Sequence, residues 1–502
     1  MNINQIKNIG AAIVLSALAI WIGLLFGNSF QLNEASFDKT VASEHRFLLK
    51  EKLAPAFESA SSNVFSFTNK IVAAESEVNK ALEAEGKGDL KISDSYQIAL
   101  TKASGVGFVS KNNVLLFFLV FGLLIFGTML FILPDLKKLP GIKNDGIFKH
   151  PVNRGKVLGI ILGSLLISFY ILLYFFPQYI INWLIVLDPL SKFMNGGMAS
   201  QWFLYGFLYT VAVLTMGIRM LIKYRHNKYQ MVRTGSVMFF QLIFAFMIPE
   251  ILTKLNMPSA DLKNMWPLDY SFFFDYRIDE KIEAGTLGTF MFVWGIVLFA
   301  VGVPVLTYFF GKRWYCSWVC GCGGLAETLG DPFRQLSDKS MKAWKIERYL
   351  IHTVLVLAVV MTAGVLFTYF TGKPKLLGVL DTGTLRYYYG FGVGSIFSGV
   401  VGTGFYPIMG NRVWCRFGCP LAAYLGLVQR FKSRFRITTN GGQCISCGNC
   451  STYCEQGIDV KAYAQRGQDI VRSSCVGCGI CSAVCPRGVL NLENLAEDTK
   501  KI

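Results

Sequence analysis

Thirteen cysteines carry the clearest chemistry in the sequence, and all of them lie between Cys316 and Cys485. Eight fall in two runs near the C-terminus, "CISCGNCSTYC" and "CVGCGICSAVCP", which both read C-x2-C-x2-C-x3-C. This spacing is typical of two-cluster ferredoxins, in which the fourth cysteine of each run binds the other cluster. Zinc sites would need cysteine pairs with a longer spacer. We therefore predict two [4Fe–4S] clusters, one bound by Cys444, Cys447, Cys450 and Cys485, the other by Cys475, Cys478, Cys481 and Cys454.

Small residues within these runs support the same interpretation. Gly448, Gly477 and Gly479 would let backbone amides approach the cluster sulfurs and tune their potential. The first run departs from the usual pattern because Glu455 follows its last cysteine, where proline is common. An ionised carboxylate there would lower the potential of the nearby cluster, whereas a solvated surface glutamate would not. Both alternatives are open from the sequence.

A second cysteine pattern occurs twice, in "GKRWYCSWVC" at 311–320 and "GNRVWCRFGC" at 410–419. Both copies share G-x-R-x-x-C-x3-C and follow an apolar run. On a helix, cysteines at i and i+4 share a face, so two pairs could offer four thiolates to one metal. We expect a third metal centre, most simply an iron–sulfur cluster, with redox-active dithiols and inert packing as alternatives. Its ligands would be Cys316, Cys320, Cys415 and Cys419.

Other side chains are weaker candidates. Cys322 is either an extra ligand or an unpaired thiol, and the matched Arg313 and Arg412 are membrane-interface anchors or donors to an anionic cluster. His352 could bind quinone or a metal but is more simply a hydrogen-bonded core residue. Glu250 is an acid near the end of an apolar run, where it could serve a proton or quinol or only reach the interface. No Cys-x-x-Cys-His motif occurs, and four histidines do not provide the pairs of a dihaem cytochrome, so no haem is predicted.

Most of the sequence around these residues is predicted to form membrane helices. The chain is 53% hydrophobic and 16% charged, against about 25% charged in a soluble domain. Apolar runs long enough to cross a bilayer recur along it. We expect eight spans, at roughly 8–27, 113–133, 157–177, 201–221, 235–252, 286–310, 349–370 and 391–411. The first is expected to be a retained anchor, since it lacks a strongly basic start and a clear signal-peptidase site.

Charged loops indicate the orientation. Segments 134–156, 219–233 and 412–436 hold six, five and six basic residues against two, none and none acidic, whereas 253–285 holds four against six. Basic loops face the cytoplasm, so both termini are predicted to be cytoplasmic in a bacterial inner membrane. The 371–390 loop, with three basic residues and one acidic, is a mild exception, because this topology places it outside. The net charge of +17 is spread over such loops, which argues against nucleic acid as a partner.

A soluble segment, 30–112, separates the first two spans and would lie outside. Apolar residues recur there with alternating spacings of four and three, the period of a coiled-coil seam. Either this helix folds back on its own loop, or it binds a partner or dimerises. The seam consists of Leu53, Phe57, Ala60, Val64, Phe67, Ile71, Ala74 and Val78.

The predicted fold is thus an α-helical polytopic membrane protein with a C-terminal cytoplasmic α+β two-cluster ferredoxin domain. Five regions follow along the chain. They are an anchor at 1–29, a periplasmic helical segment at 30–112, a polytopic domain at 113–436, the ferredoxin domain at 437–495 and a tail at 496–502.

From about residue 157 onward, the spans, the paired "CSWVCG" and "CRFGCP" motifs and the double cluster run resemble the membrane polyferredoxins of the NapH and NosR type. The resemblance implies an electron carrier that exchanges single electrons with the quinone pool or a cytoplasmic donor, and that serves respiration or metalloenzyme maturation. It would be a redox relay subunit more than a self-contained enzyme. NosR-type proteins carry an outer flavin domain, but 30–112 shows no flavin attachment motif, so no flavin is predicted. The first pair also lacks the family's proline after its second cysteine.

Two rival functions stay open. Accessory proteins of cytochrome oxidase assembly share the cysteine pairs and the ferredoxin run, and reduce copper for delivery. They typically add a C-terminal β-sandwich, whereas this sequence ends at Ile502. The other rival is a membrane scaffold whose clusters are structural.

Overall fold

The computed structural model describes residues 2–87, 91–92, 95–141, 157–376 and 378–495, and it divides into two compact units. The first unit comprises 1–134 and 171–207, and the second 135–170 and 208–502. The predicted tail 496–502 and most of the basic loop 134–156 lie outside the described residues.

The first unit is helical. Its elements are α1 (Ile3–Gly23), η1 (Leu24–Phe26), α2 (Glu34–Thr40), α3 (Ser43–Lys52), α4 (Ala54–Glu58), α5 (Val64–Ala84), α6 (Ser95–Ala103), α7 (Phe108–Lys111), α8 (Asn113–Ile132), η4 (Pro177–Tyr179) and α12 (Ile181–Asn195). Three further helices, η3 (Leu133–Lys137), α11 (Val157–Phe175) and α13 (Gln201–Lys223), are divided between the two units.

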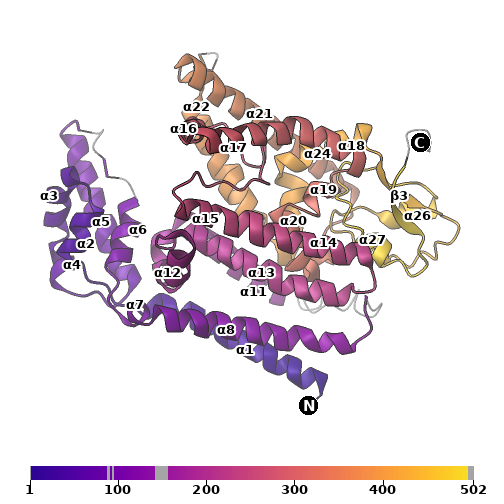
Figure 1. The fold of residues 1–502 in the computed structure, drawn as a ribbon, viewed down its shortest axis with the longest axis horizontal. Coiled ribbons are helices and arrows are strands. Elements are labelled where there is room, and N and C mark those ends of the chain that lie inside the picture. The colour runs from indigo at the N-terminus through magenta and orange to yellow at the C-terminus, as the bar shows by residue number, and fades with distance from the viewer. Residues whose placement is uncertain (1, 88–90, 93–94, 142–156, 377, 496–502) are drawn as a thin grey trace. The chain divides into compact units, whose positions relative to one another are not determined.

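The apolar helices α1 and α8 pack along one another (Figure 1). Glycine permits this close approach, because a Cβ atom on Gly10 would lie 2.7 Å from the carbonyl oxygen of Gly127. Small residues at a helix crossing are how membrane helices gain packing contacts without a hydrophobic driving force. The pair is joined to α12 by Trp183, whose indole nitrogen donates to the carbonyl of Trp21 at 2.7 Å.

The predicted coiled-coil seam is interrupted and mostly buried. The helix expected from Leu53 is divided into α4 and α5, and the seam position Ala60 falls in the connection, where it is exposed. In α5, Val64, Phe67 and Ile71 are fully buried. They pack within the unit, where α5 contacts α3 and α6. The folded-back alternative describes this arrangement, and the α5 part of the seam is closed to a partner.

The second unit combines membrane helices with a small β-containing domain. Its elements are α14 (Lys228–Phe239), η5 (Phe240–Met247), α15 (Ile248–Lys254), α16 (Asp275–Glu283), α17 (Gly285–Val297), η6 (Leu298–Gly302), α18 (Val303–Phe310), α19 (Arg313–Cys316), α20 (Gly321–Thr328), η7 (Asp331–Leu336), α21 (Met341–Thr371), β1 (Lys375–Leu376), β2 (Leu380–Asp381), α22 (Thr382–Tyr389), η8 (Gly390–Val401), α23 (Tyr406–Met409), η9 (Trp414–Gly418), α24 (Pro420–Lys432), β3 (Phe435–Thr439), α25 (Asn449–Thr452), α26 (Val460–Gln465), α27 (Ile480–Ala483) and β4 (Leu490–Asn494).

Among the described residues, seven helices are long and apolar enough to cross a membrane. They correspond to the first seven predicted spans and are Ile3–Phe26, Asn113–Lys137, Val157–Phe175, Gln201–Lys223, Lys228–Lys254, Gly285–Phe310 and Met341–Thr371. The eighth expected span, 391–411, is not one uniform helix. The run Thr382–Val401 consists of α22 continued by the π-helix η8, and turns then separate it from the short α23. Glycine is frequent in η8 and lowers its helical propensity.

The ferredoxin domain is the α+β part of this unit. Strands β3 and β4 pair antiparallel, from Phe435 opposite Asn494 to Thr439 opposite Leu490. These strands lie close to the predicted limits of the domain and hold its two ends together, with the short helices α25, α26 and α27 between them. Figure 1 shows β3 and α26 at the yellow, C-terminal end of the chain.

Candidate functional site

The eight ferredoxin cysteines gather around two cavities. One cavity is lined by Cys444, Cys447 and Cys450 of the first run together with Cys485 of the second. The other is lined by Cys475, Cys478 and Cys481 together with Cys454. Each cavity thus receives three sulfurs from one loop and one from the other. This exchange is possible because α25 and α27 pack together, and Cys454 follows α25 while Cys485 follows α27.

The two cysteine loops share one backbone conformation. Gly448 and Gly479 precede α25 and α27 with φ of 80° and 73°. One residue before the middle cysteine, Gly477 has φ of 60°, and the matching position of the first loop is Ser446 with φ of 58°. A non-glycine residue in this region is uncommon and strained. The sequence pattern indicated the three glycines but not Ser446, which adopts the same left-handed conformation.

The chemistry of the cavities suits iron–sulfur clusters. Burial raises the pKa of the Cys450 and Cys475 thiols to about 11, so these side chains remain protonated until a metal displaces the proton. A single ion with metal–sulfur bonds of about 2.3 Å would need sulfurs about 4 Å apart. Among the described residues, no group of three cysteine sulfurs lies within 4.8 Å of one another. Four cysteines line each cavity, which is the ligand set of a [4Fe–4S] cluster.

The membrane cysteine pairs also meet. Cys316, Cys320, Cys415 and Cys419 lie in one buried cluster, and Cys322 packs against it. The prediction that the two cysteines of each pair share one helix face is wrong. In each copy the first cysteine lies in a short helical turn and the second is extended, with φ and ψ of −66° and 128° at Cys320 and −79° and 112° at Cys419.

The second cysteine of each pair caps the next helix, because the chain turns there. Cys320 precedes α20, and Cys419 precedes α24 and accepts a hydrogen bond from the Ala422 amide at 3.4 Å. A helix N-terminus favours a thiolate. A hydrogen bond from Cys322, aided by the Gly323 amide, lowers the pKa of Cys320 to about 6, whereas burial raises that of Cys316 to about 12.

The two arginines matched in the repeat have different surroundings. Arg412 is 1% exposed and donates to the Cys415 sulfur at 3.6 Å and to the Cys316 carbonyl at 3.3 Å. Arg313 instead donates to Asn494 at 3.1 Å and lies over the Phe435 ring. Arg412 therefore touches the cysteine cluster, while Arg313 attaches the first copy to the ferredoxin strands.

A buried ion-pair network connects the two cysteine regions. Glu455 is fully buried and accepts from Arg334 at 2.5 Å, from Arg412 at 2.9 Å and from Asn411 at 3.1 Å. Glu327 pairs with the same two arginines, each at 2.6 Å. The alternative of a solvated surface glutamate at position 455 is thus wrong. Both glutamates lie within 4.8 Å of the Cys478 sulfur.

Arginines hold this network together. Glu327 also forms an ion pair with the buried Arg233, and Arg334 donates to Asp331 at 2.9 Å. Although burial opposes ionisation, the surrounding cations hold the pKa of Glu327 and of Asp331 well below the usual range. Buried charges persist only when they are paired in this way. The carboxylates face arginines, so they form a clamp between the domains of this unit rather than a cation site.

The remaining candidates, Glu250 and His352, lie on helices α15 and α21. Glu250 is partly buried in the first turn of α15. His352 lies on α21, and its Nδ1 is 2.6 Å from the carbonyl oxygen of Arg348. It lines a cavity that also reaches Cys415.

Comparison with known proteins finds matches to iron–sulfur families over the two cysteine regions. Residues 292–340 and 390–438, which each contain one C-x3-C pair, match a family described as a 4Fe-4S binding domain. Residues 415–490 match a 4Fe-4S dicluster domain. A relative from Escherichia coli (strain K12), named as an electron transport protein, YccM, is 28% identical over 161 residues. The match covers 31% of this chain and 44% of YccM, and no solved structure matches.

Proposed function

We propose that this membrane polyferredoxin relays single electrons through two [4Fe–4S] clusters with crossed ligand sets and through a third, cysteine-ligated centre. The family matches are to 4Fe–4S binding domains and YccM is named as an electron transport protein, and together they support an electron-carrying role. The observation that carries the ligand assignment is the sharing of each cavity between the two runs. The first cluster is held by Cys444, Cys447, Cys450 and Cys485, and the second by Cys475, Cys478, Cys481 and Cys454.

The crossed assignment is tested with one cysteine from each run. Cys454→Ser should remove the signal of the second cluster and leave the first, because Cys454 lines the second cavity. Cys485→Ser is the matched variant and should have the opposite effect. Electron paramagnetic resonance of the reduced, full-length protein separates the two signals. Loss of the first cluster in Cys454→Ser would contradict the assignment.

The third centre would be held by Cys316, Cys320, Cys415 and Cys419. The buried thiols converge, and the Arg412 guanidinium would offset negative charge. The match of both repeat copies to a 4Fe–4S binding family supports iron as the metal. When bound, such a centre accepts and donates one electron, while these residues exclude water and hold the thiolates.

Iron content distinguishes this centre from a dithiol pair. Two cubane clusters hold about eight iron atoms per chain, and a third cluster would add about two or four. Cys415→Ser should remove only this excess, and Cys322→Ser should keep it if Cys322 is not a ligand. A wild-type content of about eight would refute the third centre. Redox titration of the same samples tests the scaffold alternative, because structural clusters would not change oxidation state at accessible potentials.

A relay in a membrane needs an electron donor and an electron acceptor. On one side we propose a quinone pool or a cytoplasmic donor, and on the other a respiratory or metalloenzyme-maturation partner. The protein is then a redox subunit that acts through its partners. Copurification from native membranes, followed by mass spectrometry, identifies them; recovery of a copper chaperone instead would favour the copper-reducing alternative.

Both termini are proposed to be cytoplasmic, with 30–112 in the periplasm. This orientation needs the helical run Thr382–Val401 and its continuation to form an eighth crossing, because seven crossings would separate the termini. Proteolysis of inside-out vesicles tests it: 30–112 should be protected and the ferredoxin domain cleaved. Protection of the ferredoxin domain would overturn this topology.

A further inference from the structure

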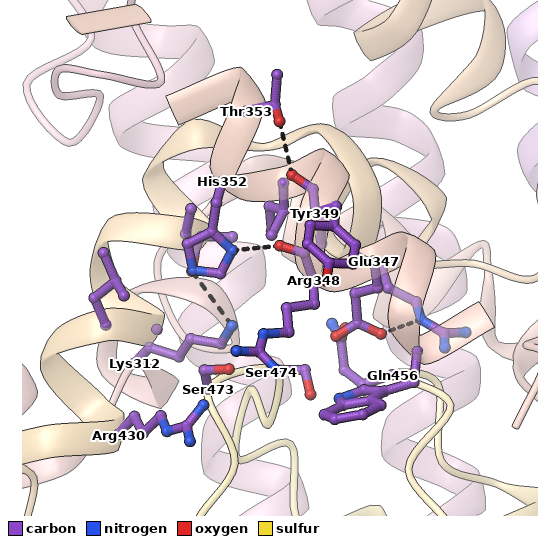
Figure 2. A pocket seen from close by; sticks show the side chains of 18 of the residues that line it. Lys312, Glu347, Arg348, Tyr349, His352, Thr353, Arg430, Gln456, Ser473 and Ser474 are labelled. Carbon is purple, nitrogen blue, oxygen red and sulfur yellow. Dashed lines mark hydrogen bonds and ion pairs between the residues drawn. The ribbon is translucent and has the colours of Figure 1, made fainter. Parts of the chain in front are cut away.

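A cavity of about 570 Å³ lies between α21, α24 and the loops of the ferredoxin domain. Figure 2 shows its polar side chains, with Lys312, Arg348 and Arg430 around the space and His352 above it. Cys415 also lines it, as does Gln456, which lies two residues after Cys454. The proposed electron relay gives this cavity no role.

The cavity contains more positive than negative charge. Lys312 is 1% exposed, and its ammonium donates a long hydrogen bond, 3.5 Å, to the Ala422 carbonyl oxygen. Arg348 and Arg430 form no ion pair within the described part of the chain. Glu347, the sole acid among the lining residues, is already paired with Arg416 at 2.7 Å. Three cations therefore face the cavity without a carboxylate.

The same cavity holds buried polar atoms that lack partners. Gln456, which also lines the cavity of the second cluster, is 3% exposed, and neither its amide nitrogen nor its amide oxygen is hydrogen-bonded to a described residue. The Nη2 atom of the buried Arg416 is likewise free. Buried polar groups are nearly always hydrogen-bonded, since an unmet donor costs free energy. Two of these three atoms, the Gln456 amide nitrogen and the Arg416 Nη2, are donors, so a ligand that matches the cavity carries several oxygen acceptors.

Away from these groups, the lining is apolar. Ile351 and Val356 of α21 and Leu427 and Phe431 of α24 line it, and Phe431 is 70% exposed. A ligand that matches both the cationic and the apolar lining residues has a negatively charged oxygen-rich head and a hydrocarbon tail.

We propose that this cavity binds the headgroup of an anionic phospholipid. The phosphodiester oxygens accept from Lys312, Gln456 and Arg348, and the acyl chains lie along α21 and α24. Basic pockets between membrane helices are known sites for anionic headgroups. A neutral quinone head would meet the free donors but would leave the three cations without a counterion. A bound lipid would also join the membrane helices to the ferredoxin loops.

Trp344 lines the cavity and provides a local probe. The full-length protein is placed in phosphatidylcholine nanodiscs containing increasing brominated phosphatidylglycerol, and tryptophan quenching is recorded. Subtracting the Trp344→Phe variant isolates the signal of Trp344 from the other tryptophans. Saturable quenching is expected with brominated phosphatidylglycerol and not with brominated phosphatidylcholine.

The double variant Arg348→Gln/Arg430→Gln removes two exposed cations without disturbing the core. At about 1 kcal/mol per basic residue and 1.4 kcal/mol per tenfold, half-saturation should require about 30-fold more phosphatidylglycerol. The control Lys345→Gln/Lys432→Gln removes two exposed charges on the same helices but outside this cavity, and should change little.

Three results would overturn the proposal. Equal losses in the two double variants would indicate general surface attraction instead of a site. Inorganic phosphate that prevents quenching at low concentration would place free phosphate there. Quenching that is the same with charged and neutral brominated lipids, and that a short-chain quinone relieves, would assign the cavity to a quinone.

Discussion

Glu455→Gln should raise the reduction potential of the second cluster. The Glu455 carboxylate is fully buried, and one of its oxygens lies within 4.8 Å of the Cys478 sulfur. Glutamine has nearly the same shape and keeps an acceptor for Arg412, but it removes one negative charge. The added electron of the reduced cluster then meets less repulsion, while the positive charge of Arg334 and Arg412 remains.

The size of the shift follows from Coulomb's law. Two unit charges about 5 Å apart interact by about 3 kcal/mol at an effective dielectric constant of about 20. For a one-electron couple, about 1.4 kcal/mol corresponds to about 59 mV, so the limit is about 140 mV. Because the electron is spread over the cluster, beyond the nearest sulfur, we expect an increase of about 100 mV.

The measurement is a redox titration followed by electron paramagnetic resonance on the full-length protein. Glu493→Gln, the same substitution on β4 outside the second cavity, is the control and should leave the potential nearly unchanged. Losing one acid from a buried ion-pair network costs about 3–5 kcal/mol, so iron content is measured first. Glu327→Gln should shift the potential in the same direction. A shift below about 30 mV, or a negative one, would refute the reasoning.

Three further predictions concern packing and backbone conformation. Ser446→Gly should raise the free energy of unfolding by up to about 1 kcal/mol, measured as iron release in guanidinium, because glycine adopts the φ of 58° without strain. Gly477→Ala should lower it, since the new Cβ would lie 2.6 Å from the Cβ of Arg313; unchanged iron retention would contradict this contact. Gly127→Leu should separate α1 from α8 and destabilise the first unit by about 1–3 kcal/mol, with cluster spectra unchanged. Fluorescence of Trp21, which stacks on Trp183, reports that loss during urea unfolding.

Local patterns in the sequence predicted much of this molecule. Seven apolar runs became membrane helices because a bilayer requires length and hydrophobicity, both visible in the sequence. The grouping of Cys454 with the second run and of Cys485 with the first is the one expected from the ligand spacing of two-cluster ferredoxins. The seam of α5 was also visible, but its period could not say what covers it. In the structure, α3 and α6 of the same unit pack against α5.

Contacts between distant segments were not visible in the sequence. Glu455 follows a cysteine in the ferredoxin domain, while Arg334 and Arg412 belong to the membrane part of the sequence, and no local pattern links them. The conformation of the C-x3-C pairs was missed for a related reason. Spacing alone favours one helix face, but the chain turns at Cys320 and Cys419 so that two new helices can begin.

The departures of the first repeat copy from the second have a packing explanation. After Cys419 the chain continues with Pro420, which suits the first turn of a helix. After Cys320 it continues Gly-Cys-Gly-Gly, and this helix lies closer to its neighbours. A Cβ on Gly323 would lie 2.0 Å from the Cys316 carbonyl oxygen, and one on Gly324 2.5 Å from the Val237 side chain. Glycine is therefore required on that side of α20, and the close approach brings Cys322 within hydrogen-bonding reach of Cys320. The two copies of one motif thus contribute unequal halves to the membrane cysteine cluster, with the extra thiol on one half and the sulfur-bonding Arg412 on the other.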